Sequence, residues 1–289
     1  MKGNGVAVAH GAVSILNAFA TGKGAAIGVC LWTRARVTLH DGAGEMHGLV
    51  TPGQGSIQLA TKVVDKVLEH YGYGGKLHGE VATSSNIPTA VGLKSSSAAA
   101  NAVALATASA LDQEPDDDAL VEIGVEASLE CGVSLTGAYD DSFASWHGGA
   151  VLTDNDRRKV EKVLKVPENI RIIILVPPRQ TLTGSLDRRR FVPVKRISEL
   201  AYIEAGNGHV WDALTLNGLA FSAVLGEDPR PALSAIEAGA LGAGLSGKGP
   251  AVVAAVEEKD SKRVRQAFEK FDGRIIETEP NYSRACVET

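Results

Sequence analysis

The alternation of strand-like and helix-like segments constrains the fold of this chain more than any other feature. Apolar and β-branched runs predict strands at Val6–Ala9, Ala35–His40, Gly79–Thr83, Arg171–Val176, Ala251–Val256 and Gly273–Glu277. Helical spacing of apolar residues predicts helices at Ser56–Tyr71, Asp116–Leu129, Ile197–Ala205, His209–Leu219 and Lys262–Phe271, and Ile87–Leu111 reads as a loop that runs into an alanine-rich helix. Strands that alternate with helices predict a layered α/β or α+β fold.

Composition sets the broad class. The 289 residues are 44% hydrophobic with a formal net charge of −5, which excludes a largely disordered chain and argues against a nucleic-acid-binding protein. The chain is long enough for one large domain or two ordinary ones. The polar stretch Asp154–Lys159 is the predicted boundary, which divides the chain into residues 1–155 and 156–289.

The cysteines and the apolar segments indicate where the protein works. Cys30, Cys131 and Cys286 are odd in number and far apart, so they predict neither a disulfide framework nor a metal site. The N-terminus carries no run typical of a secretory signal, and no segment approaches about 20 uninterrupted apolar residues. We therefore expect a cytoplasmic protein without a membrane or nucleic-acid partner, and the sequence leaves a homo-oligomer open.

The strongest chemical signal lies before the alanine-rich helix. A proline and glycine loop leads into three serines that open this helix, and the residues concerned are Pro88, Gly92, Leu93, Lys94, Ser95, Ser96 and Ser97. A helix N-terminus offers unpaired N–H groups and a positive dipole end, which together favour a bound phosphate. The spacing is not that of a Walker A loop. The alternative is a helix that the serines merely cap.

A second signal is the cluster of glycines from Gly239 to Gly249 before the predicted strand at Ala251–Val256. Such a loop loses chain entropy on folding, and backbone contact with a ligand is a common compensation. The candidate phosphate contacts are Gly244, Ser246, Gly247 and Gly249. On its own, a loop of this kind is weak evidence for a phosphate site.

A third signal is the pair Asp140–Asp141, which we place in a strand-like setting between glycine turns. Adjacent carboxylates can orient a hydroxyl nucleophile or hold a metal ion. A solvated turn is the alternative for the pair considered alone. His10 and His147 are more typical of structural histidines than of catalytic ones.

The order of these three motifs resembles the GHMP kinase superfamily. Pro88–Ala98 matches its P-x-x-x-G-L-G-S-S-A-A loop, except that Lys94 replaces the second glycine. The resemblance implies an α+β protein with a ribosomal-S5-domain-2-like nucleotide-binding domain over residues 1–155 and a ferredoxin-like domain over 156–289. One departure stands at Ala9–Ala12, where mevalonate kinases carry a lysine; a lysine–aspartate pair is therefore unavailable at that place.

Within the superfamily, Ser14–Gly24 and the motifs around Asp140 and Gly244 resemble the archaeal-type shikimate kinases. The resemblance implies transfer of phosphate from ATP, with Mg²⁺, to the 3-hydroxyl of shikimate, a step toward chorismate and aromatic amino acids. It implies that Asp140 accepts the hydroxyl proton with support from Asp141, and that Ser96 binds Mg²⁺ with Glu130 as a further ligand. The candidate substrate contacts are Asn17, Lys23, and the run Arg188, Arg189 and Arg190, since a guanidinium matches the shikimate carboxylate with two hydrogen bonds. A solvated basic loop is the alternative for this run. The alternatives are a kinase of another small alcohol, such as homoserine or a mevalonate-pathway intermediate, and a non-catalytic ligand sensor.

Overall fold

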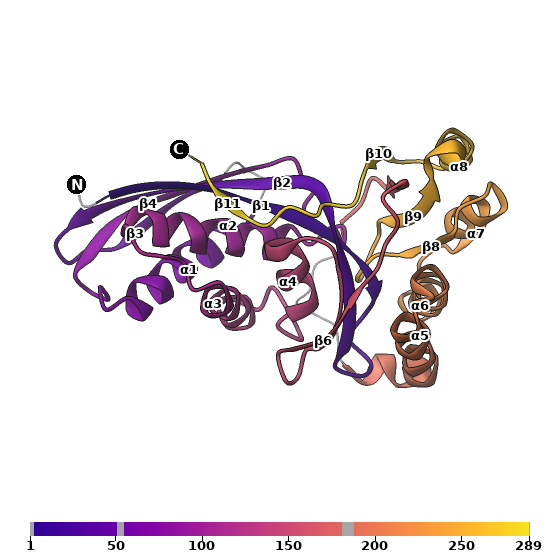
Figure 1. Cartoon of the computed structure of the whole chain (residues 1–289), viewed down its shortest axis with the longest axis horizontal. Coiled ribbons are helices and arrows are strands. Elements are labelled where there is room, and N and C mark those ends of the chain that lie inside the picture. The colour runs from indigo at the N-terminus through magenta and orange to yellow at the C-terminus, as the bar shows by residue number, and fades with distance from the viewer. Residues whose placement is uncertain (1–2, 51–54, 181–187, 289) are drawn as a thin grey trace.

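The computed structural model describes residues 3–50, 55–180 and 188–288, and its described strands form two sheets (Figure 1). The larger sheet has the order β11-β1-β2-β4-β3, and β5 extends it by pairing with β2 and with β6. Its strands are β1 (Gly3–Leu16), β2 (Lys23–Asp41), β3 (Met46–Val50), β4 (Leu77–Ser85), β5 (Ala150–Asp154), β6 (Lys159–Leu164) and β11 (Cys286–Val287).

Four helices cover one face of this sheet (Figure 1). They are α1 (Ile57–His70), α2 (Ser95–Ala110), α3 (Asp117–Glu130) and α4 (Tyr139–His147). Helix α2 is buried along most of its length, because its alanines and serines let it pack closely between the sheet and the other helices. Its predicted place in the chain is confirmed, as are α1 and the Asp116 side chain that caps α3.

The smaller sheet has the order β10-β7-β9-β8, with antiparallel neighbours throughout the described pairs. Its strands are β7 (Ile170–Val176), β8 (Gly242–Leu245), β9 (Val252–Glu257) and β10 (Arg274–Thr278). Helices α5 (Lys195–Asn207), α6 (Val210–Leu225), α7 (Arg230–Glu237) and α8 (Ser261–Phe268) accompany it, together with the 3₁₀ helices η1 (Arg188–Val194) and η2 (Glu258–Asp260). The two sheets with segregated helices confirm the α+β class.

One hydrophobic core joins the two sheets. Val13 of β1 and Ile27 of β2 belong to the same buried cluster as Ile172, Ile174 and Val253 of the smaller sheet. The long strands β1 and β2 therefore reach from the helical layer of the larger sheet to the smaller sheet (Figure 1). The division at residues 155/156 stays a prediction; it falls in the turn between β5 and β6. Within the described residues no helix is long and apolar enough to cross a membrane.

Two local predictions are wrong. Asp140 and Asp141 lie in the first turn of helix α4, because Gly137 and Ala138 adopt positive φ angles of 75° and 53° and turn the chain into the helix. The glycine-rich stretch, predicted as a loop, also contains a strand, β8. A Cβ atom at Gly244 would lie 2.6 Å from the Cα atom of Gly218, so this glycine allows α6 to pack tightly on β8.

Candidate active site

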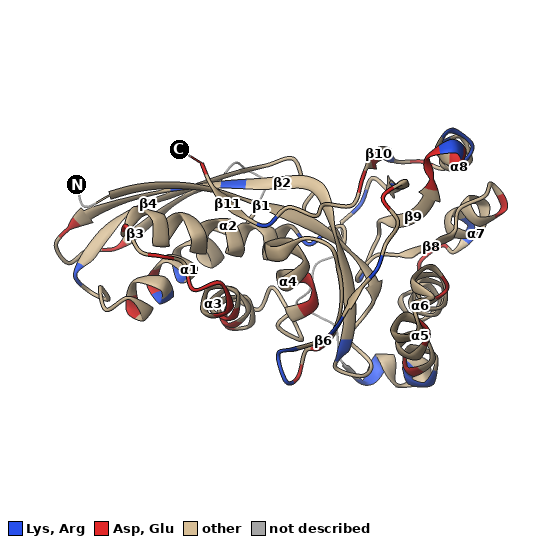
Figure 2. Cartoon of the chain, in the orientation of Figure 1, with Lys and Arg blue, Asp and Glu red and all other residues tan. Residues whose placement is uncertain are grey.

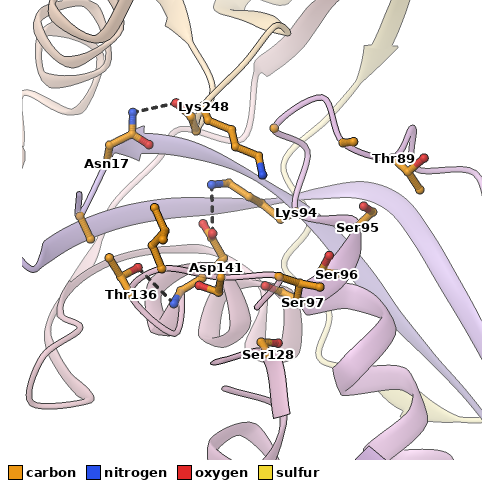
Figure 3. Close-up of a pocket in the computed structure, with 18 of the residues that line it drawn as sticks. Asn17, Thr89, Lys94, Ser95, Ser96, Ser97, Ser128, Thr136, Asp141 and Lys248 are labelled. Atoms are coloured by element: carbon orange, nitrogen blue, oxygen red, sulfur yellow. Dashed lines mark hydrogen bonds and ion pairs between the residues drawn. The ribbon is translucent and has the colours of Figure 1, made fainter. Parts of the chain in front are cut away.

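A cavity of about 500 Å³ lies where the predicted motifs meet. Its walls come from the end of β1, the loop before α2, the first turns of α2 and α4, and the glycine-rich loop after β8 (Figure 3). The predicted site residues that line it are Asn17, Gly92, Lys94, Ser95, Ser96, Ser97, Asp140, Asp141 and Gly247. Segments up to 230 residues apart in the sequence therefore build one site.

The N-terminus of α2 opens into this cavity. Lys94 is its N-cap residue, in a left-handed conformation with φ 60° and ψ 31°, and no side chain caps the helix. The alternative of a helix whose serines cap it is therefore wrong. Since the first N–H groups of a helix have no partner within the helix, this end offers donors and a positive dipole to an anion.

The glycine-rich loop is fixed by hydrogen bonds to β1 and to the loop before α2. The Ser246 hydroxyl donates to the carbonyl of Gly92 at 2.7 Å and accepts from the Ser14 backbone N–H at 3.1 Å. The Gly247 N–H donates to the Ser14 hydroxyl at 3.1 Å, and the Asn17 amide donates to the Gly247 carbonyl at 2.9 Å. These hydrogen bonds fix the position of the glycine-rich loop relative to β1 and to the loop before α2, on the two sides of the cavity.

Asp140 is buried and held by Asn155. The Asn155 amide nitrogen donates to Oδ1 of Asp140 at 2.7 Å, and the Asn155 amide oxygen accepts from the Thr153 hydroxyl at 2.7 Å. Burial raises the pKa of Asp140 above its ordinary value, against the opposing effect of nearby Lys94. Figure 2 shows the acidic turn of α4, in red, on the side that faces the long strands.

Asp141 has a different environment, and its carboxylate points into the cavity toward Lys94 (Figure 3). The Lys94 ammonium lies 3.0 Å from Oδ2 of Asp141, while the buried Oδ1 has no hydrogen-bond partner in the described structure. Burial, and then the charge of Asp140, raise the pKa of Asp141 to about 7. Asp141 is therefore poised to gain or lose a proton near neutral pH.

Lys248 is a cavity residue that the sequence analysis passed over. It is half-buried in the glycine-rich loop and points toward the space that Lys94 enters (Figure 3). Burial, and then the charge of Lys94, lower the pKa of Lys248 to about 8. A lysine inside a glycine-rich loop is the signal that could have identified it.

Asn155 was also missed, because its polar surroundings were taken for a domain boundary.

Several predicted contacts lie elsewhere. Glu130, at the end of α3, pairs with Lys66 at 2.7 Å and Lys62 at 3.3 Å and is not among the described cavity residues. We therefore correct its role: it is not placed to bind a metal in this site. Within the described ranges no three His, Cys, Asp or Glu side chains cluster as metal ligands.

Some predicted phosphate contacts also lie outside the described cavity wall. Leu93 is buried in the hydrophobic core. The others support the walls without lining the described cavity, and they are Pro88, Gly244, Ser246 and Gly249.

The predicted substrate cations are not in the described cavity wall. Lys23 lies over the ring of Tyr202, with its ammonium 4.6 Å from the ring centre. Arg189 and Arg190 are exposed in η1, and Arg190 donates to the carbonyl of Val224 at 3.1 Å. The side chain of Arg188 lies outside the described part of the chain.

Comparison with known proteins identifies the class. The chain matches the family GHMP kinases N terminal domain over residues 58–149 and the family GHMP kinases C terminal over residues 210–273. The chain belongs to the GHMP kinase family, and it is a kinase that uses ATP and a small-molecule acceptor.

Particular relatives are similar over nearly their whole length. A shikimate kinase from Methanothrix thermoacetophila is 42% identical, with 98% of this chain and 94% of the relative covered. One from Thermococcus kodakarensis is also 42% identical, with 94% and 98% covered. A solved homoserine kinase from Cytophaga hutchinsonii has a TM-score of 0.79 at 19% identity, covering 100% of this chain and 98% of that one. The mevalonate kinase structure from Methanococcus jannaschii has a TM-score of 0.75 at 17% identity, covering 96% and 98%. These structures confirm the expected fold.

Proposed function

We propose that this protein transfers the γ-phosphoryl group of ATP to the 3-hydroxyl of shikimate. The observation that carries the proposal is about 40% identity to proteins named shikimate kinase along nearly the full chain. The site also contains groups that a phosphotransferase requires. They are a helix end that can bind an anion, a buried carboxylate with one oxygen that has no hydrogen-bond partner, and two lysines at the same cavity. These groups also weigh against a non-catalytic sensor.

The cavity suggests how the reactants are arranged. The N–H groups at the start of α2 bind the phosphates of the nucleotide, and the acceptor hydroxyl lies toward Asp141. The hydroxyl oxygen attacks the γ-phosphorus, the bond to the β–γ bridging oxygen breaks, and ADP leaves with that electron pair. The hydroxyl proton passes to the carboxylate of Asp141. Positioning and charge stabilisation account for most of the catalysis in such transfers.

This assignment exchanges the roles first given to the two aspartates. Asp140 shares its Oδ1 with the Asn155 amide, so its orientation is fixed by that hydrogen bond. Asp141 keeps a buried acceptor oxygen without a partner. An unpaired buried acceptor is unfavourable in its charged form, which makes Asp141 the more ready of the two carboxylates to take up a proton.

The residues at the helix end fit a magnesium ion bound together with nucleotide phosphates. Mg²⁺ prefers oxygen ligands and commonly uses only one or two protein groups besides phosphate and water. The hydroxyl of Ser96 lines the cavity at the helix N-terminus and is the proposed ligand. When bound, the ion would offset the negative charge of the phosphates.

The stretch Arg188–Arg190 remains the proposed contact for the shikimate carboxylate. Phe191 of η1 stacks on Phe19 with ring centres 5.1 Å apart, and Phe19 lines the cavity. The arginines therefore lie on a segment packed against the cavity wall. A planar guanidinium matches a carboxylate with two parallel hydrogen bonds.

Replacing Arg189 by Met is expected to raise the KM for shikimate by about tenfold or more, because its charged hydrogen bonds to the carboxylate are lost, and to leave the KM for ATP unchanged. Steady-state kinetics with each substrate varied in turn measure both constants. Arg196→Met, on the exposed start of α5, is the matched control and should behave as the wild type. Wild-type shikimate kinetics in Arg188→Met, Arg189→Met and Arg190→Met alike would contradict this carboxylate site.

A substrate panel tests the proposed function. Wild-type enzyme is assayed with MgATP and shikimate, homoserine, mevalonate or galactose, and ADP release is followed. We expect kcat/KM for shikimate to exceed that for the other alcohols by about 10³-fold or more, because a site built for several polar groups discriminates strongly. A preference for another alcohol would replace shikimate as the substrate, and no turnover with any of them would favour a sensor.

A further inference from the structure

We propose that Lys94 is the catalytic cation of this kinase, supplied to Asp141 by the loop before α2. The proposal deepens the proposed function and rests on it for the reaction, but it does not depend on which alcohol is the acceptor. Two independent features carry it: the geometry of the ion pair, and the backbone conformation that places the lysine.

The ion pair is short and shielded from water. The Lys94 ammonium lies 3.0 Å from Oδ2 of Asp141, and the two side chains are only 12% and 9% exposed. Both side chains line the cavity, and Figure 3 shows the ammonium above the carboxylate, between it and the glycine-rich loop. Its nitrogen lies 3.1 Å from the position that a Cβ atom at Gly247 would take. The ammonium is thus within reach of both the proton acceptor and the wall of the phosphate site.

The backbone at Lys94 is unfavourable for a lysine. Its φ of 60° is the left-handed conformation, which is less favourable than the right-handed one for any residue with a side chain. Glycine adopts this conformation freely, and the matching position of the family loop is a glycine. Strain of this kind is typical of functional sites. Here it carries an ammonium group directly to a buried carboxylate.

The charges around the pair define what Lys94 does. The charged groups that act on Asp141 are Asp140 on the same helix and Lys94 from the loop before α2. Lys248 of the glycine-rich loop lines the same cavity, and the charge of Lys94 lowers its pKa. Ionising two adjacent buried carboxyl groups is unfavourable in free energy unless a cation lies beside them. Lys94 therefore favours the ionised form of Asp141, which is the form that accepts the hydroxyl proton. During transfer the Lys94 side chain stabilises the charge that develops on the phosphoryl oxygens.

Lys94→Met and Lys94→Gly test this role, with Lys259→Met, at an exposed lysine of η2, as the control. In both Lys94 variants we expect kcat to fall by at least about 10²-fold, as for other preorganised charge contacts. The acidic limb of the kcat–pH profile should also move to higher pH, because Asp141 loses the cation that favours its ionised form. Lys94→Gly removes the backbone strain as well, so its Tm at pH 6 should equal or exceed that of the wild type.

A lysine that only holds the fold together would give the opposite pattern: a lower Tm in both variants, and wild-type kcat per folded molecule with an unmoved acidic limb. A lysine that only grips the nucleotide would raise the KM for ATP and leave kcat and its pH profile unchanged. Either result would overturn the proposal. If the wild type prefers an alcohol other than shikimate, the same assays run with that alcohol, so failure of the shikimate assignment is distinguishable from failure of the role of Lys94.

Discussion

Replacing Asp141 by Asn should lower kcat by about 10³-fold or more while ATP still binds, because the variant loses the group that accepts the hydroxyl proton in the transition state. Asparagine has nearly the same volume and can still accept a hydrogen bond from Lys94. The fold should therefore persist. Single-turnover phosphotransfer and ATP titration measure the two effects separately.

Asp140→Asn is the matched control. The asparagine oxygen can still accept from Asn155, so we expect less than about a tenfold loss of kcat. Since the charge of Asp140 helps to raise the pKa of Asp141, its removal should also shift the acidic limb of activity to lower pH. The reverse ranking of the two variants would show that Asp140 is the proton acceptor.

The raised pKa of Asp141 makes both turnover and stability depend on pH. Asp141 must be ionised to accept a proton, so turnover should fall as pH falls through about 7. Because its pKa in the folded state lies above the unfolded value, folding binds a proton between about pH 4 and 7, and this carboxyl lowers stability as pH rises through that window. Asp141→Asn should accordingly raise Tm at pH 8 and change it little at pH 4. A lower Tm at pH 8 would contradict this account.

Ser96→Ala should lower Mg²⁺-dependent kcat by about 10²–10³-fold, the loss typical of one contact to the transferring group. The fold should be unaffected, because no serine side chain caps α2. A titration of kcat against Mg²⁺ concentration should show a higher half-saturation point. The exposed Ser84→Ala on β4 should match the wild type. Wild-type Mg²⁺ dependence in Ser96→Ala would remove this residue as a ligand.

Much of the fold could be predicted because its patterns are local. The helical spacing in α1, the acidic start of α3 and the apolar run of β7 each follow from neighbouring residues. The helical conformation of Asp140 and Asp141 could not be predicted from neighbouring residues. Helix α4 has only nine residues and no clear apolar periodicity, and it begins after the positive φ angles of Gly137 and Ala138.

The members of the site could be predicted better than their roles. Helix-end serines, paired aspartates and a glycine-rich loop are recognisable types, and the cavity brings them together. Which aspartate is free depends on Asn155, whose amide contacts Asp140 across 15 residues of sequence. That Lys94 faces Asp141 depends on the left-handed turn at one residue and on where α4 lies. Such relations arise only from the tertiary arrangement.

The central claim is that this cavity phosphorylates shikimate through Asp141, and product analysis tests it most directly. Wild-type enzyme and Asp141→Asn are incubated with shikimate and MgATP, and the products are followed by phosphorus and proton NMR. We predict one phosphomonoester at the 3-hydroxyl, formed in equal amount with ADP by the wild type and about 10³-fold more slowly by the variant. ADP without a shikimate phosphate, an ester at another hydroxyl, or equal rates from the two proteins would contradict the account.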